Sequence, residues 1–254
     1  MDLITTTLNI EKYVLGLQQM PKSLEVVLSP ALLSEVDIVG KNVVVIDILR
    51  ATSTICTALH HGALGVKPVT HAEEAALLKD IGYITAAERN GEKLPGFDMG
   101  NSPFECMDGK VKDKYIALTT TNGTKCIEMT DGAANVLSGS FLNISSLANW
   151  LIDSPNDIIL FCAGWKDKVN MEDTLFAGAL ALKLKSFVEI DCDSAQMAMQ
   201  IYRNNSDRII DFLKDSSHYK RLSRLHHEED MIYCFQEDIM DCVPVLKNGI
   251  LVAY

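Results

Sequence analysis

Short apolar runs alternate with longer amphipathic stretches from residue 24 onward. Runs of about five aliphatic or β-branched residues are typical of strands, whereas apolar residues three or four positions apart indicate helices. The predicted strands are residues 24–28, 43–49, 65–69, 83–87, 115–119, 135–137 and 157–162. The predicted helices are residues 52–61, 72–80, 103–108, 123–129, 144–152 and 172–185. Because strands and helices alternate, we predict an α/β fold, a layered α/β/α arrangement with a largely parallel sheet.

The two ends of the chain depart from this alternation. Residues 1–23 form an N-terminal extension in which Ile10, Val14 and Leu17 have helical spacing. Residues 190–240 indicate several helices, so the C-terminal part is expected to be helix-rich, and residues 249–252 are a candidate last strand. Residues 24–254 are expected to form one domain, or two α/β subdomains without a recognisable linker between them.

Composition favours a cytoplasmic protein with an ordinary core. The 254 residues are 48% hydrophobic, as in packed soluble domains. The net charge of −11 argues against nucleic acid or an anionic membrane surface as a partner. A small anionic substrate remains compatible, because a bound cation or a few donors can reverse the field inside a cleft. The seven cysteines include no CxxC pair and no signal peptide precedes them, so we expect free thiols in the cytoplasm.

Polar motifs follow several predicted strands at the point where each strand ends. Ligands of open parallel sheets bind outside the carboxyl ends of the strands. The motifs are Asp47 with residues 50–54, Glu88 with residues 89–91, residues 119–124, residues 138–143 and residues 162–164. Their shared position predicts one binding site at this edge of the sheet.

Acidic residues in these motifs are candidate metal ligands. Asp47 follows an aliphatic run, where an unpaired carboxylate is costly to desolvate; a metal ion, an ion pair with Arg50 or a helix-capping role would each resolve this. Glu88 fits a metal ligand or general base, or a salt bridge to Arg89. A further acidic pair opens the helix predicted at 172–185, where the helix dipole alone also favours it. Mg²⁺ prefers oxygen ligands and retains water, so two or three carboxylates suffice. The candidate Mg²⁺ ligands are Asp47, Glu88, Glu172 and Asp173.

Other residues of the motifs are candidates for binding an oxyanion. The planar fork of Arg50 suits phosphate or sulfonate oxygens, and the hydroxyl residues that follow it open a helix, where they can bind an anion or act as ordinary caps. Asn122-Gly123 is a strong hairpin signal, but the residues after it indicate a helix. We therefore favour a strand–loop–helix turn that cradles an oxyanion. The candidate substrate-binding residues are Arg50, Thr52, Ser53, Thr54, Thr120, Thr121, Asn122, Gly123, Thr124 and Ser140.

Histidines and cysteines give weaker signals. His226-His227 precedes an acidic cluster that ends in Asp230, and a metal or acid role there is the minority interpretation. Cys162 ends a strand, but Lys168 stands where a cysteine phosphatase needs its anion-binding arginine. A buried thiol is the better interpretation of Cys162.

Taken together, the motifs resemble those of the 2-phosphosulfolactate phosphatase (ComB) family, over about residues 24–253. The segments that carry the resemblance are 46–54 (IDILRATST), 87–91 (AERNG), 96–103 (GFDMGNSP), 120–124 (TTNGT), 162–164 (CAG), Glu172-Asp173 and, more weakly, Tyr233-Cys234, Asp238 and Val243-Pro244. Residues 165–170 are less glycine-rich than the family pattern. The resemblance implies Mg²⁺-dependent hydrolysis of 2-phospho-3-sulfolactate to 3-sulfolactate and phosphate, a step of coenzyme M synthesis.

For this hydrolysis, the candidate catalytic residues are Asp47, Glu88 and Arg50. Either a metal-polarised water or Asp47 itself would attack the phosphoryl group, with positioning and charge neutralisation supplying most of the catalysis. Two other functions fit the same anion pocket: a Mg²⁺-dependent lyase or isomerase of phosphorylated hydroxy acids, and a non-catalytic anion-binding protein. A homodimer is a further expectation.

Overall fold

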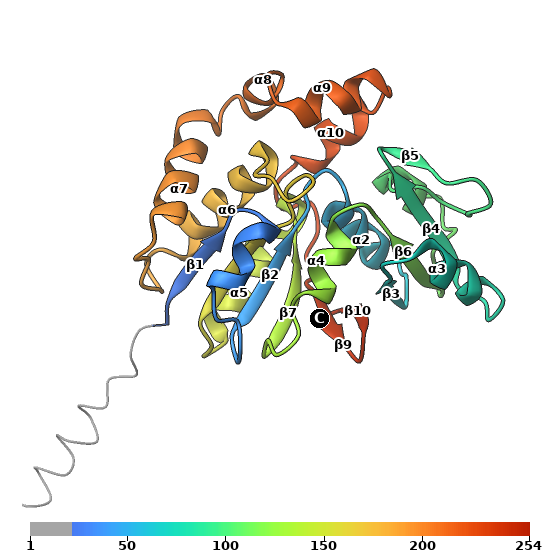
Figure 1. The fold of residues 1–254 in the computed structure, drawn as a ribbon, viewed down its shortest axis with the longest axis horizontal. Coiled ribbons are helices and arrows are strands. Elements are labelled where there is room, and N and C mark those ends of the chain that lie inside the picture. Colours follow the sequence, from blue (N-terminus) through green and yellow to red (C-terminus); the bar gives the residue numbers. More distant parts are fainter. Residues whose placement is uncertain (1–21) are drawn as a thin grey trace, which may run out of the picture.

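The computed structural model describes residues 22–254, so the helical spacing noted within residues 1–21 lies outside the described residues. The strands are β1 (Leu24–Val27), β2 (Asn42–Ile46), β3 (Gly65–Pro68), β4 (Ile84–Arg89), β5 (Glu92–Lys93), β6 (Tyr115–Thr119), β7 (Asn135–Gly139), β8 (Ile158–Cys162), β9 (Pro244–Lys247) and β10 (Ile250–Ala253). The helices are α2 (Ala51–His60), α3 (Ala72–Lys79), α4 (Gly123–Glu128), α5 (Ile144–Asp153), α6 (Met171–Leu184), α7 (Asp193–Asn205), α8 (Ile209–Leu213), α9 (Ser217–Arg224) and α10 (Glu228–Cys234). The predicted α/β class is confirmed (Figure 1).

One 10-stranded sheet runs through the described residues in the order β1-β8-β2-β7-β9-β10-β3-β6-β4-β5. It contains two parallel blocks, β1-β8-β2-β7 and β3-β6-β4. The antiparallel hairpin β9–β10 joins them, with β9 beside β7 and β10 beside β3. The prediction of a largely parallel sheet is confirmed, and the two α/β blocks form one continuous sheet.

Helices cover both faces of the first block, because its central strand is apolar on both sides. Every residue of β2 is buried. Val44 and Ile46 belong to the core shared with α5, α6 and α7, whereas Val43 and Val45 belong to the core shared with α2 and α4. This is the pattern of a buried parallel strand, and it produces the predicted α/β/α layers.

The C-terminal hairpin is the main difference from the predicted elements. Sequence patterning gave one last strand at 249–252, but the structure has two strands joined by a turn at Asn248-Gly249. Both turn residues have positive φ, 51° for Asn248 and 77° for Gly249, as a type I′ hairpin turn requires. At Asn122-Gly123 the structure has the start of α4, so the strand–loop–helix interpretation of that segment is confirmed.

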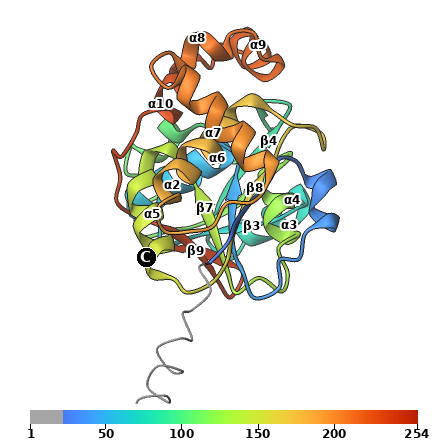
Figure 2. The same cartoon turned by 90° about the vertical axis from the view of Figure 1, so that its left-hand side faces the viewer.

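The predicted helix-rich part comprises α7, α8, α9 and α10. Helix α7 packs closely on α6, where a Cβ on Gly178 would lie only 2.1 Å from the carbonyl oxygen of Ala198. Figures 1 and 2 both show α8, α9 and α10 together at one end of the molecule, above the layered body. We call these three helices the cap. No helix within residues 22–254 is long and apolar enough to span a membrane.

Leu251 of β10 tests the hairpin's role in joining the two blocks. Its side chain is fully buried and it pairs with Val66 of β3 and Leu246 of β9. Leu251→Ala is expected to lower the free energy of unfolding by about 2–4 kcal/mol, because it leaves a cavity between the blocks. Val252→Ala, at the half-buried neighbouring position, should lose less than about 1.5 kcal/mol. If urea unfolding shows that the two variants lose the same free energy of unfolding, the result would argue against this role for the hairpin.

Candidate active site

A small cleft lies where the loops after β2, β4, β6 and β8 meet helix α9 of the cap. Its volume is about 20 Å³, enough for about one water molecule. A wider hollow of about 290 Å³ adjoins it and shares Arg50, Gly91 and Asn101 with it. The residues that line the cleft are Asp47, Leu49, Arg50, Glu88, Gly91, Asn101, Thr121, Asn122, Trp165, His218, Arg221 and Leu222.

Asp47 enters the cleft directly after β2. Its backbone N–H donates to Thr52 Oγ1 at 3.2 Å, which fixes the turn into α2. Gly123 packs against the carboxylate, since a Cβ at that position would lie 2.7 Å from Asp47 Oδ2. Burial raises the pKa of Asp47 to about 6; Glu88 and Glu172 also raise it, while His218 and the N–H of Ala51 oppose the shift.

Glu88 and Glu172 approach the site from a strand and a helix, respectively. Glu88 is the penultimate residue of β4 and lines the cleft, and its Oε1 accepts a hydrogen bond from the backbone N–H of Gly91. Glu172 lies behind the lining, in the first turn of α6, with 1% of its surface exposed. Its Oε1 is hydrogen-bonded to Nδ1 of His218, whereas its buried Oε2 has no protein partner.

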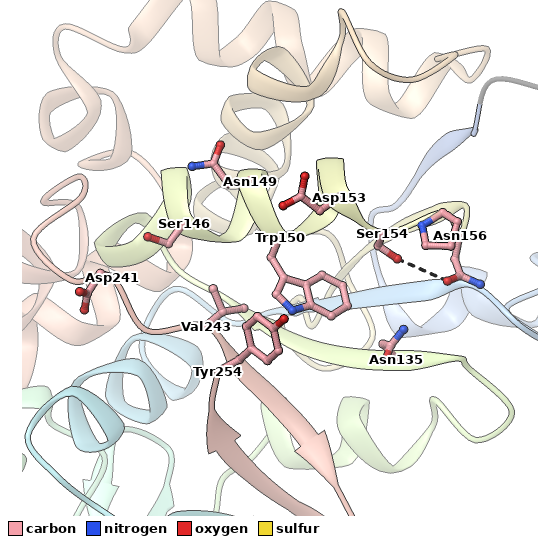
Figure 3. Close-up of a pocket in the computed structure, with 11 residues that line it drawn as sticks. Asn135, Ser146, Asn149, Trp150, Asp153, Ser154, Asn156, Asp241, Val243 and Tyr254 are labelled. Carbon is pink, nitrogen blue, oxygen red and sulfur yellow. Dashed lines mark hydrogen bonds between the residues drawn. The ribbon is translucent and has the colours of Figure 1, made fainter.

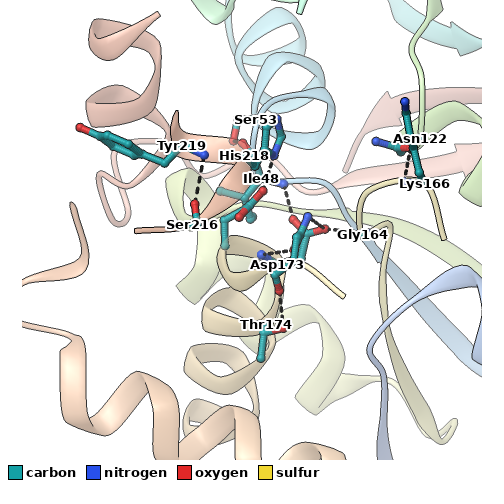
Figure 4. A network of polar contacts seen from close by, with 12 residues as sticks. Ile48, Ser53, Asn122, Gly164, Lys166, Asp173, Thr174, Ser216, His218 and Tyr219 are labelled. Carbon is teal, nitrogen blue, oxygen red and sulfur yellow. Dashed lines mark hydrogen bonds and ion pairs between the residues drawn. The ribbon is translucent and has the colours of Figure 1, made fainter. Parts of the chain in front are cut away.

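Asp173 is bound within the protein and does not line the cleft. Its Oδ1 accepts from the N–H of Ile48 at 2.9 Å, and its Oδ2 accepts from the N–H of Gly164 at 3.0 Å and from Asn170 Nδ2 at 2.8 Å (Figure 4). Burial raises its pKa well above the usual range, and the charge of Asp47 adds to the shift. Through these hydrogen bonds, Asp173 connects the segments that follow β2 and β8.

Arg50 faces the cleft but is already paired. Its guanidinium forms a buried ion pair with Asp230 of α10 and donates to the carbonyl oxygen of Gly91 at 3.1 Å. The other carboxylate oxygen of Asp230 accepts from Ser102 Oγ at 2.6 Å. The pair therefore ties the cap to the loops after β2 and β4.

Several predicted substrate-binding hydroxyls are bonded inside the protein. Thr52, Ser53, Thr54 and Ser140 are buried and do not line the cleft. Their hydroxyls bond, in that order, to the N–H of Asp47, the carbonyl of Ile48, the carbonyl of Asn101 and the N–H of Leu142. In this structure they shape the turn from β2 into α2 and the start of the helix after β7.

The loop after β6 divides into structural and cleft-facing residues. Thr120 and Thr124 close the loop on each other, since each hydroxyl accepts from the other's backbone N–H, at 3.3 and 3.2 Å. Thr121 and Asn122 line the cleft, and the buried Thr121 Oγ1 has no partner. Thr121 and Asn122 are thus the part of the predicted cradle that lines the cleft, while Gly123 packs against Asp47.

Three cleft residues with polar or aromatic side chains lie outside the sequence motifs: Trp165, His218 and Arg221. Trp165 lies in the loop after β8, and the other two lie on α9. The ring of Trp165 stacks on His218, with ring centroids 5.7 Å apart, and on the guanidinium of Arg221, 3.4 Å from the ring centroid. The spacing of His218 and Arg221, three positions apart on a short polar helix, was a weak signal, because a polar helix face is usually only solvated.

A second hollow, of about 500 Å³, lies at the other end of the sheet (Figure 3). Its lining includes Trp150, Tyr254, Asn135 at the start of β7 and residues 154–156 before β8. The charged side chains along it, Asp153 and Asp241, are both acidic. It is therefore poorly suited to a phosphate ester. The smaller cleft is lined by five of the predicted site residues, Asp47, Arg50, Glu88, Thr121 and Asn122.

Comparisons with known proteins find similar sequences over most of the chain. The family model described as 2-phosphosulpholactate phosphatase matches residues 27–249. Three relatives, each named "Probable 2-phosphosulfolactate phosphatase", come from Caldanaerobacter subterraneus subsp. tengcongensis (42% identical, 85% of this chain and 91% of the relative), Thermotoga maritima (43%, 84% and 92%) and Clostridium novyi (38%, 87% and 95%).

The raised pKa of Asp47 predicts a stability gain on neutralising this residue. The unfolded chain ionises Asp47 near pH 3.8 and the folded chain near pH 6, so the cost of burying the charge grows between these values and is complete above pH 6. In metal-free buffer Asp47→Asn should raise the free energy of unfolding by about 2–3 kcal/mol at pH 7.5 and by almost nothing below pH 4. A gain at pH 4 as large as at pH 7.5, in urea unfolding at both pH values, would contradict this.

Proposed function

Because the chain belongs to the 2-phosphosulfolactate phosphatase family, a family of phosphoric monoester hydrolases, we propose that it hydrolyses 2-phospho-3-sulfolactate to 3-sulfolactate and phosphate with Mg²⁺. The observation that carries the proposal is the convergence of Asp47, Glu88, Thr121 and Asn122 in one small cleft. In an organism that makes coenzyme M, this cytoplasmic reaction would supply its sulfonate precursor.

The oxygen atoms around the cleft fit a hard cation. Asp47 and Glu88 line it, and Glu172 Oε2 and Thr121 Oγ1 are buried nearby without protein partners. Within residues 22–254 no three His, Cys, Asp or Glu side chains are grouped so as to hold a metal by themselves. One or two carboxylates, completed by water and phosphoryl oxygens, are the usual protein share of a Mg²⁺ site. Asp47 and Glu88 would hold the ion, which when bound stabilises negative charge on the phosphoryl oxygens and polarises water.

The protein's own groups would position the ester. The Thr121 hydroxyl and the Asn122 amide can donate to phosphoryl oxygens, and Gly123 leaves room for their loop to lie against Asp47. We favour water as the nucleophile over Asp47, because a loose transition state demands little deprotonation of the attacking group. The departing alkoxide needs a proton, and His218, held through Nδ1 by Glu172, lines the cleft as the candidate donor.

Phosphate release from 2-phospho-3-sulfolactate tests the reaction. The wild-type protein should release inorganic phosphate and leave 3-sulfolactate, with activity lost on chelation and restored by Mg²⁺. Asp47→Asn should lower kcat/KM at least about 100-fold, whereas Asp80→Asn, at an exposed position at the end of α3, should retain it. A product with a rearranged carbon skeleton would indicate a lyase or isomerase, and stabilisation by substrate without turnover would indicate a binding protein.

The role of His218 has a separate signature. His218→Asn should slow alkyl phosphates by about 100-fold or more and p-nitrophenyl phosphate far less, because only the alkoxide needs a proton as it leaves. Steady-state rates on both substrates measure this difference. Equal losses would assign His218 to the structural support of Glu172.

A further inference from the structure

Arg221 is a cation in the cleft without an anionic partner. It lines the cleft from α9, and none of the ion pairs between described residues includes it. Its Nε is buried and lacks a hydrogen-bond acceptor. Arg50 differs in this respect, because Asp230 already neutralises it. Leaving a buried donor unsatisfied is costly, so Arg221 is suited to an acceptor that arrives with a ligand.

Trp165 holds the Arg221 fork in place. The guanidinium carbon lies 3.4 Å from the centroid of the Trp165 ring, and such stacking restricts a guanidinium while leaving its N–H edge available. Trp165 itself lies in a tight turn, where its N–H donates to the carbonyl of Lys168 at 2.9 Å and the reverse bond is 3.1 Å. Gly164, with φ of 60°, allows this turn, since a Cβ there would lie 2.2 Å from Lys168 O. The fork is therefore preorganised before a ligand binds.

The charges that face the cleft suggest what Arg221 recognises. Asp47 and Glu88 approach from the strand ends, and Thr121 and Asn122 from the loop after β6. Under the proposed function these groups serve Mg²⁺ and the phosphoryl group. Arg221 comes from the opposite side, on the cap. Burial lowers its pKa, and the charges of Glu88, Glu172 and Asp47 counter that shift, so its charge is supported by carboxylates that it does not contact as ion pairs.

We propose that Arg221, clamped by Trp165, binds a second oxyanion of the substrate, a carboxylate or sulfonate on the carbon skeleton, and so makes the enzyme selective for small phosphate esters that carry one. The inference rests on the proposed function and adds the residue that determines this selectivity. A bidentate Arg–oxyanion contact supplies both affinity and orientation, and it would hold the cap over a bound substrate.

A substrate series with Arg221→Met tests the assignment. The series is 2-phospho-3-sulfolactate, 2-phospholactate (carboxylate only), 2-phosphooxyethanesulfonate (sulfonate only) and ethyl phosphate (neither). Relative to wild type, kcat/KM should fall about 10- to 100-fold for esters that carry the recognised anion, and less than about threefold for ethyl phosphate. The second and third substrates identify which oxyanion Arg221 binds. Trp165→Leu should lower kcat/KM less than Arg221→Met does, and for the same substrates. It removes the ring that stacks on Arg221 but leaves the positive charge of Arg221 in place.

The control is Arg224→Met, at an exposed position on the same helix, which should match wild type on all four substrates. Melting temperatures and circular dichroism establish that each variant is folded, and Arg221→Lys provides a milder change that keeps the charge and loses the fork. If Arg221→Met lowers kcat/KM equally for every substrate, ethyl phosphate included, Arg221 binds the phosphoryl group and the proposal is overturned. The absence of any loss would overturn it as well.

A binding measurement separates this inference from the proposed function. 3-Sulfolactate should raise the melting temperature of the wild-type protein, and the rise should disappear in Arg221→Met and persist in Arg224→Met. If wild type releases no phosphate from any ester yet shows this pattern, the proposed function fails and the oxyanion site stands. If wild type shows no such rise, the oxyanion site is overturned whether or not phosphate is released.

Discussion

The burial of several carboxylates at one end of the sheet is the constraint on which the site depends. Asp47, Glu172 and Asp173 each expose 8% or less of their surface, and desolvation together with the neighbouring carboxylates raises the pKa of Asp47 and of Asp173. The protein stabilises Asp173 with three hydrogen-bond donors and Glu172 with His218. Asp47 keeps its carboxylate at the cleft with a raised pKa. A cluster of buried carboxylates of this kind is stabilised most by a ligand that carries positive charge.

The cap completes the site because polar bonds attach it to the strand ends. The Arg50–Asp230 pair joins α10 to the loop after β2, and the His218–Glu172 bond joins α9 to α6. Removing either partner of a buried pair leaves an uncompensated charge, which is strongly unfavourable. The same helix α9 then brings Arg221 to the cleft. The family relationship accounts for the phosphatase, while this arrangement supports a role for Arg221 that the strand-end motifs alone do not suggest.

Local patterns predicted most of the elements, because the signals for them lie within a few residues. The aliphatic run before Asp47 is a buried strand in the structure, and the turn at Asn122-Gly123 starts a helix as the residues after it indicated. The hairpin β9–β10 was predicted as a single strand. Its place at the centre of the sheet follows from pairing with β7 and β3, strands that are far away in the sequence.

The sequence by itself determined the fold class, the family and the end of the strands at which the candidate site lies, since each is encoded in apolar spacing or in contiguous motifs. It also identified Asp47, Glu88 and Thr121 as candidates. Only the tertiary structure decided that Asp173 and Thr52 are bonded internally, because their partners come from other segments or from the folded turn. It also brought α9 to the cleft. The chemistry of a side chain is written in the sequence, but whether its polar atoms are free or satisfied depends on neighbours that only folding brings together.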